Sequence, residues 1–130
     1  MRSKALVLLL LLPVSTCFCQ SRIVAMKCGT LNDERSDAPM ENAVILVLGR
    51  AITQVGTGLI IPAEASVIDL SGATVAAALL DQSGKIEEIA PGAFADIVAV
   101  KAIPLQDITI LKHIGFVVKD GKVVKDEMKR

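Results

Sequence analysis

The chain has 130 residues, of which 52% are apolar and 22% charged, and its 14 basic residues balance its 14 acidic ones. This length allows one small domain, because globular domains usually contain about 100 to 150 residues. The neutral balance and the 2% aromatic content argue against nucleic-acid binding, which needs a basic surface and often stacking aromatic rings. The single histidine excludes a catalytic metal site built from several imidazoles.

The first residues predict a signal peptide. Residues 1–4 are basic, residues 5–14 are apolar and residues 15–19 are mostly small. The apolar run is too short for a bilayer span, which needs about 20 residues, so the pattern is typical of a cleaved leader. We therefore expect a signal peptide over residues 1–19 and an exported protein, periplasmic or secreted, with no transmembrane segment in its mature part. A lipid anchor at Cys17 is the alternative.

Cleavage of this leader would change the chemistry of the chain. Arg2, Lys4 and two of the three cysteines leave with it, so the mature chain keeps a small acidic excess and only Cys28. One cysteine cannot form an internal disulfide, so the domain must be held together by its apolar core. We interpret Cys28 as a small buried apolar residue rather than as a reactive thiol.

The remainder of the chain shows mainly β-strand patterns separated by turns. Runs of β-branched and other apolar residues predict strands over residues 22–27, 43–48, 51–55, 66–70, 95–100, 116–119 and 122–125. Tight hairpin links are expected at Gly49-Arg50 and at Asp120-Gly121, because Asp-Gly is a favoured two-residue hairpin turn. Further expected features are a polar loop over 32–39, turns at 71–72 and 90–92, a short helix over 74–81, a helical turn capped by Asp107, and a frayed tail over 128–130.

Two sets of motifs resemble the two ends of one protein family. The metal-dependent amidohydrolase superfamily, in its imidazolonepropionase-like and Xaa-Pro-dipeptidase-like branch, opens with segments similar to Cys28-Gly29-Thr30-Leu31, residues 41–47, residues 52–56 and Val67-Ile68-Asp69-Leu70-Ser71-Gly72-Ala73-Thr74-Val75. Its closing segments are similar to residues 86–100, 104–108 and 116–124. Together these stretches cover nearly all of the mature chain.

The resemblance implies both a fold and a missing part. In that family the two ends form a small β-sandwich, the composite domain, while the middle forms a (β/α)8 barrel of about 250 residues or more that carries the active site. This chain has no room for the barrel. The implied fold is therefore mainly β, a small β-sandwich with one short helix and no (β/α)8 barrel. Its composite domain covers residues 20–130, with a family N-terminal segment over 20–74, a junction over 75–85 and a family C-terminal segment over 86–130.

The junction aligns with the family in two ways. In one register, Ser83 and Lys85 stand where the family has a His-x-His pair on its first barrel strand. In the other, residues 76–80 belong to the last barrel helix, and Gly84-Lys85-Ile86 begins the closing segment. The second register fits better, because Ala76 and Ala77 replace the family's usual Leu-Pro. Neither register supplies a metal ligand.

The family's chemistry is hydrolysis of C–N bonds with a divalent metal, which lowers the pKa of a bound water and polarises the carbonyl. His113 lies where the family has no ligand, so we interpret it as a loop residue. We assign no catalytic, cofactor-binding or metal residue and expect no cofactor. Other groups lack the spacing of a known site. Asp33, Glu34 and Asp37 lack the order of a calcium loop, and Gly56 and Gly58 lack the third glycine of a phosphate loop. Glu87 and Glu88 are adjacent and would point to opposite faces of a strand, and no base accompanies the serines in a triad motif: Ser36, Ser66, Ser71 and Ser83.

Three functions follow from these observations. The first is a truncated amidohydrolase-family protein that is inactive alone. The second is a hydrolase acting on C–N bonds that is completed by a barrel on another polypeptide, and the third is a small secreted binding module. Loss of the barrel would expose an apolar patch, which we expect near Val75 to Leu80 as a surface for self-association or for a barrel partner.

Overall fold

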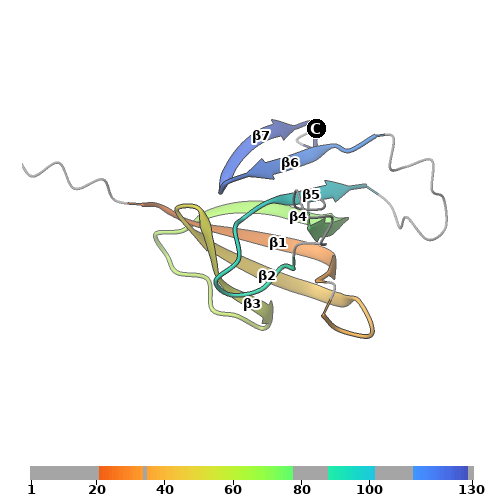
Figure 1. Cartoon of the computed structure of the whole chain (residues 1–130), viewed down its shortest axis with the longest axis horizontal. Helices are drawn as coiled ribbons and strands as arrows, with labels where there is room; N and C mark the ends of the chain where they lie inside the picture. Colours follow the sequence, from red (N-terminus) through yellow and green to blue (C-terminus); the bar gives the residue numbers. More distant parts are fainter. Residues whose placement is uncertain (1–20, 34, 78–87, 102–112, 129–130) are drawn as a thin grey trace, which may run out of the picture.

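The computed structural model describes residues 21–33, 35–77, 88–101 and 113–128. In these ranges the chain forms strands and no helix, which confirms the mainly β class, and it contains no (β/α)8 barrel (Figure 1). The strands are β1 (Ile23–Asn32), β2 (Met40–Leu48), β3 (Ala51–Thr57), β4 (Ser66–Ala77), β5 (Ile97–Val100), β6 (Phe116–Lys119) and β7 (Lys122–Asp126).

All of these strands belong to one seven-stranded sheet, in the order β3-β2-β1-β4-β5-β6-β7 (Figure 1). Neighbouring strands are antiparallel except β1 and β4, which are parallel. Parallel neighbours need a long connection, and here the β2–β3 hairpin and the loop of residues 58–65 supply it. Where a sandwich was expected, the described strands are thus connected in a single sheet.

This sheet bends at a bulge between β1 and β4, which we name the corner. Cys28 pairs with Leu70 and Thr30 with Thr74, so residues 71–73 all lie opposite the single Gly29. A Cβ atom at Gly29 would overlap the carbonyl oxygen of Ser71, so only glycine allows the two backbones to come this close. Extra residues bend and twist a strand. The turn predicted at residues 71–72 is therefore wrong, because β4 continues through it as a bent strand.

The inner face of the bent sheet encloses the main core. Its largest fully buried side chains include Phe116, Met26, Leu31, Ile45 and Ile97. These residues come from both of the segments that flank the junction, so the two segments share one apolar core. Burial of this apolar surface is the main force that holds a domain without disulfides together.

Both predicted hairpins are confirmed. β2 and β3 pair in antiparallel fashion around Gly49-Arg50, and β6 and β7 pair around Asp120-Gly121. Asp120 has a φ of 50° and Gly121 a φ of 75°, the left-handed conformations that a type I′ hairpin turn requires at both central residues.

The two hairpin turns meet each other, although they are far apart in sequence. The segment of residues 92–96 joins them: Ala95 N–H donates to Arg50 O at 2.9 Å, and Gly121 N–H donates to Ala95 O at 3.0 Å. Arg50 and Asp120 also form an ion pair at 3.4 Å. We name this contact the clasp. It ties β2 and β3, at one end of the strand order, to β6 and β7 at the other.

The end of β4 corrects two predictions. Thr74–Ala77 belongs to β4 and not to a helix, because it pairs with both β1 and β5, and this pairing overrides the helical preference of alanine. Val75 is fully buried and Ala77 packs against the core, so neither forms the expected exposed patch. Residues 78–81, which carried the rest of the helix and patch, and the turn at Asp107 lie outside the described residues.

The C-terminal tail is also more ordered at its start than expected. Met128 packs against the main core, and its N–H donates to the carboxylate of Asp126 at 3.2 Å. Gly115 lies beside it, since a Cβ there would be 3.1 Å from the Met128 methyl group. Residues 129–130 lie outside the described residues.

Candidate functional site

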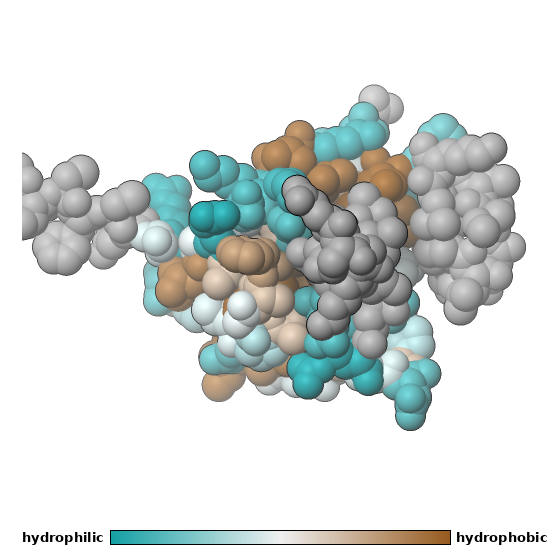
Figure 2. All heavy atoms as spheres, viewed as in Figure 1, coloured by the Kyte–Doolittle hydropathy of each residue, from teal (hydrophilic) through white to brown (hydrophobic). Residues whose placement is uncertain are grey.

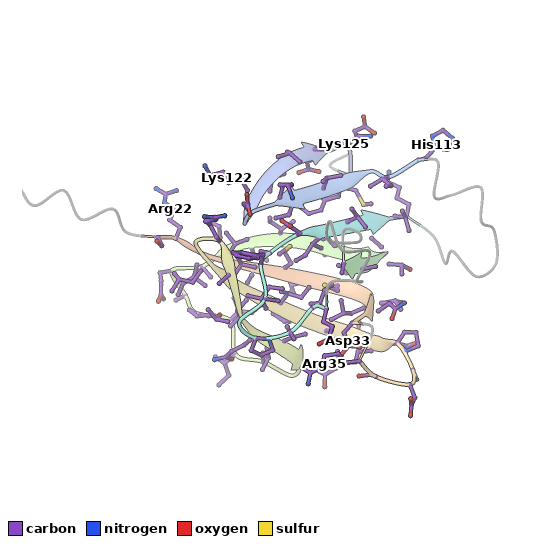
Figure 3. The ribbon with its side chains drawn as sticks, in the orientation of Figure 1. Arg22, Asp33, Arg35, His113, Lys122 and Lys125 are labelled. Atoms are coloured by element: carbon purple, nitrogen blue, oxygen red, sulfur yellow. The ribbon has the colours of Figure 1, made fainter. Side chains whose placement is uncertain are left out.

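The residues that could carry chemistry are dispersed over the fold. Figure 3 shows His113 at the upper edge of the molecule, pointing away from it, while Asp33 and Arg35 lie on the opposite side. His113 is exposed. Across the described ranges, no three His, Cys, Asp or Glu side chains lie together as they would to hold a metal ion. These residues therefore do not fit the divalent ion that the amidohydrolase resemblance implies.

Cys28 is confirmed as a buried apolar residue. It lies on β1 next to the corner with 2% of its surface exposed, and its thiol lies 3.7 Å from the carbonyl oxygen of Met26, to which it donates. Burial raises the pKa of this thiol to about 12. A nucleophilic cysteine must be a thiolate, so Cys28 is inert near neutral pH.

Asp33 organises the loop that follows β1. It is only 8% exposed and accepts hydrogen bonds from the backbone N–H groups of Arg35 (3.1 Å) and Ser36 (2.9 Å) and from the Ser36 hydroxyl (3.1 Å). Burial alone would raise the pKa of the Asp33 carboxyl, but these hydrogen bonds outweigh it and lower the pKa. Both carboxylate oxygens are thus engaged within the loop, which accounts for Asp33 as a turn-forming residue rather than as a calcium ligand.

One hollow lies beside this loop, and another lies at the corner. A cavity of about 360 Å³ is lined by Asp33, Arg35, Ser36, Met40, Val55, Ile89 and Pro91. A smaller one of about 270 Å³ is lined by Gly29, Thr30, Glu41, Asn42, Ser71, Gly72, Ala73, Thr74 and Lys101. Neither lining includes a histidine or a cysteine, so the hydroxyl groups there have no neighbouring imidazole base. The Arg35–Glu88 ion pair at the rim of the first is half-exposed and spans 3.6 Å, which contributes little.

Asp96 is the structurally important carboxylate that sequence reasoning missed. Its side chain is 10% exposed and accepts from the backbone N–H of Asp120 at 2.7 Å and from Lys119 Nζ at 3.3 Å. It therefore anchors the β6–β7 turn within the clasp. An acidic residue directly before a buried strand is the sequence signal that could have drawn attention to it, because a buried charge needs partners.

Among the described residues, the exposed large apolar side chains lie outside the segment of residues 75–77. Large apolar residues with substantial exposure are Leu48, Ile60, Val67, Phe94, Val123 and Val124. Phe94 lies under the Arg50 guanidinium, with 5.4 Å between the guanidinium carbon and the ring centre, a cation–π contact within the clasp. Figure 2 shows apolar surface over β6 and β7 and over the loop between β3 and β4, each bordered by polar atoms.

No helix in the described part of the chain has the length and apolar character needed to cross a membrane.

Comparison with solved structures gives a partial likeness. No protein-family model matches the chain, and no curated protein matches it. Among solved structures, the chain is similar to a crystal structure of a Xaa-Pro dipeptidase with bound methionine in the active site, at 28% sequence identity and a TM-score of 0.41. The match covers 45% of this chain and 15% of the dipeptidase chain. It is a weak structural similarity to a dipeptidase, confined to a small part of that protein.

Proposed function

We propose that this chain is a non-catalytic composite domain of the amidohydrolase type, exported through a leader over residues 1–19 and inactive as a hydrolase on its own. Residues 20–74 and 86–130 would be the two halves of that domain, joined where the family has a barrel. The observation that carries the proposal is that β4, which begins in the first half and continues into the junction, pairs with β5 of the second half within one sheet.

The pairing is supported by the core. Thr74, the last residue of the first half, and the junction residues Val75 to Ala77 pair with Ile97 to Val100 of the second half. Phe116 of the second half is fully buried in the same cluster as Met26 and Leu31 of the first. A domain can accept or lose an insertion where its own strands still meet. The two halves make such a contact here, so a barrel is not needed for burial of the main core.

The absence of hydrolytic activity is inferred from the residues. Hydrolysis of a C–N bond near neutral pH requires an activated water and a polarised carbonyl. The family uses histidine ligands for this purpose, whereas this sequence contains one histidine, the exposed His113. The function that remains is that of a scaffold or a binding domain, and the exposed apolar side chains of Leu48, Ile60 and Val67 favour binding as the second candidate.

Metal analysis combined with a substrate panel tests this proposal. The purified full chain is incubated with Zn²⁺ or Mn²⁺, desalted, assayed for bound metal, and then given dipeptides, linear amides and cyclic amides. We expect no stoichiometric metal and no turnover above that of the His113→Ala variant. Turnover by the wild type that this variant loses, together with bound metal, would overturn the proposal. Activity that appears only on addition of the native exported fraction would instead support a barrel supplied by another polypeptide.

Export is tested separately, by the mass of the protein recovered outside the cytoplasm. Cleavage of the leader predicts a mature chain that starts at Gln20. Recovery of the intact chain in the cytoplasm alone would contradict export without affecting the proposal about the fold.

A further inference from the structure

The outer face of the sheet, opposite the main core, carries a second and smaller apolar cluster. Ala25, Val44 and Leu46 are buried there beneath the loop of residues 58–65, whose Leu59, Ile61 and Ala65 pack on them. Ile60 lies between two residues that point inward, and its own side chain is 89% exposed. This loop covers part of the outer face and presents an apolar side chain to solvent.

Two strand residues extend the apolar surface beside this loop. Leu48 of β2 pairs with Ile23, and Val67 of β4 pairs with Ala25. Ile23 and Ala25 are two positions apart on β1, so all four side chains lie on the same face of the sheet. Leu48 is 43% exposed and Val67 53% exposed, so two large apolar side chains on this face are open to solvent.

A charged groove lies next to these residues. It has a volume of about 520 Å³ and is lined by Ser21, Arg22, Ile23, Leu48, Glu64 and Ser66. The ion pairs formed among the described residues include neither Arg22 nor Glu64. Figure 3 shows Arg22 extending away from the sheet at the end where β1 begins. The groove is therefore lined by two apolar side chains, two serines and one charge of each sign.

The other exposed apolar surface, on β7, is less suited to association. Val117 pairs with Lys125 and Val118 with Val123, so Val124 is an extra residue in a bulge. Bulges and lysines on an edge strand oppose pairing with another strand, and Lys122 and Lys125 flank this bulge. The outer-face groove has neither feature.

We propose that the outer-face groove is a self-association surface, at which a second copy of this chain binds in a symmetric dimer. A twofold axis brings the same surface of two copies together, so a residue of one sign can meet a residue of the other sign twice. Arg22 of one copy then pairs with Glu64 of its partner, and Ile60, Leu48 and Val67 form the apolar centre. The small size of this surface predicts a weak, concentration-dependent dimer.

Sedimentation velocity tests this dimer in the purified full chain, whose N-terminus is defined by intact mass, at about 1 to 500 μM. We expect Arg22→Glu alone and Glu64→Arg alone each to raise the dimer dissociation constant by about tenfold, and the double reversal to restore it to within about threefold. Ile60→Ser should also weaken the dimer, whereas Val124→Ser, which alters another exposed apolar side chain, on β7, should not.

Thermal melts of each variant verify that all of them fold, which surface positions permit. A monomer at every concentration would overturn the proposal. So would a dimer that the single reversals leave unchanged, that the double reversal fails to restore, or that Val124→Ser weakens as much as Ile60→Ser does. Restoration by the double reversal distinguishes this groove from association through the apolar leader, whose contacts the charge exchange would not repair.

Discussion

The corner and the clasp both bring two backbones into contact at a glycine, but the surroundings of the two glycines differ. Gly29 lies within the β1–β4 ladder, where the strands are held on both sides of the bulge by regular pairing. Gly121 lies in a half-buried hairpin turn, and a Cβ there would overlap the carbonyl oxygen of Gly49 in another turn. The corner is therefore locked into the sheet, whereas the clasp joins two turns that can separate.

The fold therefore depends on local backbone shape at the corner and on long-range contacts at the clasp. The corner determines how the sheet bends, and without that bend the core cannot close. The clasp is held by the buried carboxylate of Asp96, by one exposed ion pair, and by the backbone hydrogen bonds that link Ala95 to Arg50 and to Gly121. We expect changes at the corner to unfold the domain and changes at the clasp to loosen one end of it.

The largest effect is expected at the corner. Gly29→Ala should destabilise the domain by about 3 kcal/mol, because the new methyl group must displace the backbone at Ser71 rather than a flexible side chain. Urea unfolding followed by circular dichroism measures the change. Gly72→Ala is the matched control on the facing strand, since nothing lies within 4 Å of a Cβ there, and it should change the free energy of unfolding by less than about 0.5 kcal/mol. Equal effects of the two variants would disprove the close contact at the corner.

The thiol of Cys28 supplies a second measure of the corner. Burial raises its pKa to about 12, so at pH 8 it is protonated in the native state and reacts with a thiol reagent only when the structure opens. Gly29→Ala should speed its labelling greatly. If Cys28 of the wild type were labelled as fast in buffer as in urea, the corner would be open in the native state.

A smaller effect is expected at Gly121. Gly121→Ala should lower the free energy of unfolding by about 2 kcal/mol, because of the left-handed conformation at this position and because the new methyl group would overlap the carbonyl oxygen of Gly49. Gly58→Ala separates these causes, because Gly58 has a φ of 69° with nothing near its Cβ, and it should cost about 1 kcal/mol. Cys28 labelling should stay slow in Gly121→Ala, since the clasp opens without the corner. Fast labelling would show that the two regions unfold as one unit.

The next largest effect is expected at Asp96, whose carboxylate anchors the β6–β7 turn. Asp96→Ala should destabilise the domain by about 1.5 kcal/mol, because the Asp120 N–H loses its acceptor. Asp96→Asn keeps an acceptor oxygen and should recover at least half of that loss, as measured by the same urea titration. A loss in Asp96→Asn equal to that in Asp96→Ala would mean that the charge facing Lys119, and not the hydrogen bond, holds the turn.

The smallest effect is expected at the surface of the clasp. Arg50→Ala removes an exposed ion pair with Asp120 and the stacking on Phe94, and should cost less than about 1 kcal/mol. At about 1 M salt, the part of this loss in stability that is due to the ion pair should become smaller. A cost above that of Asp96→Ala would reverse the proposed order of importance within the clasp.

Local sequence patterns specify the individual strands and turns of this protein. Period-two and apolar runs located the strands, and Asp120-Gly121 identified its turn, because left-handed backbone conformations restrict which residues a hairpin turn accepts. The count of one histidine limited the chemistry, and the lone Cys28 was correctly placed in the core, since a small apolar side chain without a disulfide partner is usually buried.

How these elements combine depends on contacts that form in the folded sheet. Residues 71–72 have turn composition yet lie within β4, and Thr74–Ala77 has helical composition yet forms its end, because pairing with β1 and β5 satisfies backbone groups that local preference cannot reach. The contact of Gly121 with Gly49 and the anchoring by Asp96 join residues that are far apart in the chain, so no local pattern encodes them. The exposed groove at Arg22 and Glu64 likewise exists only because β1, β2 and the loop before β4 meet in the folded sheet.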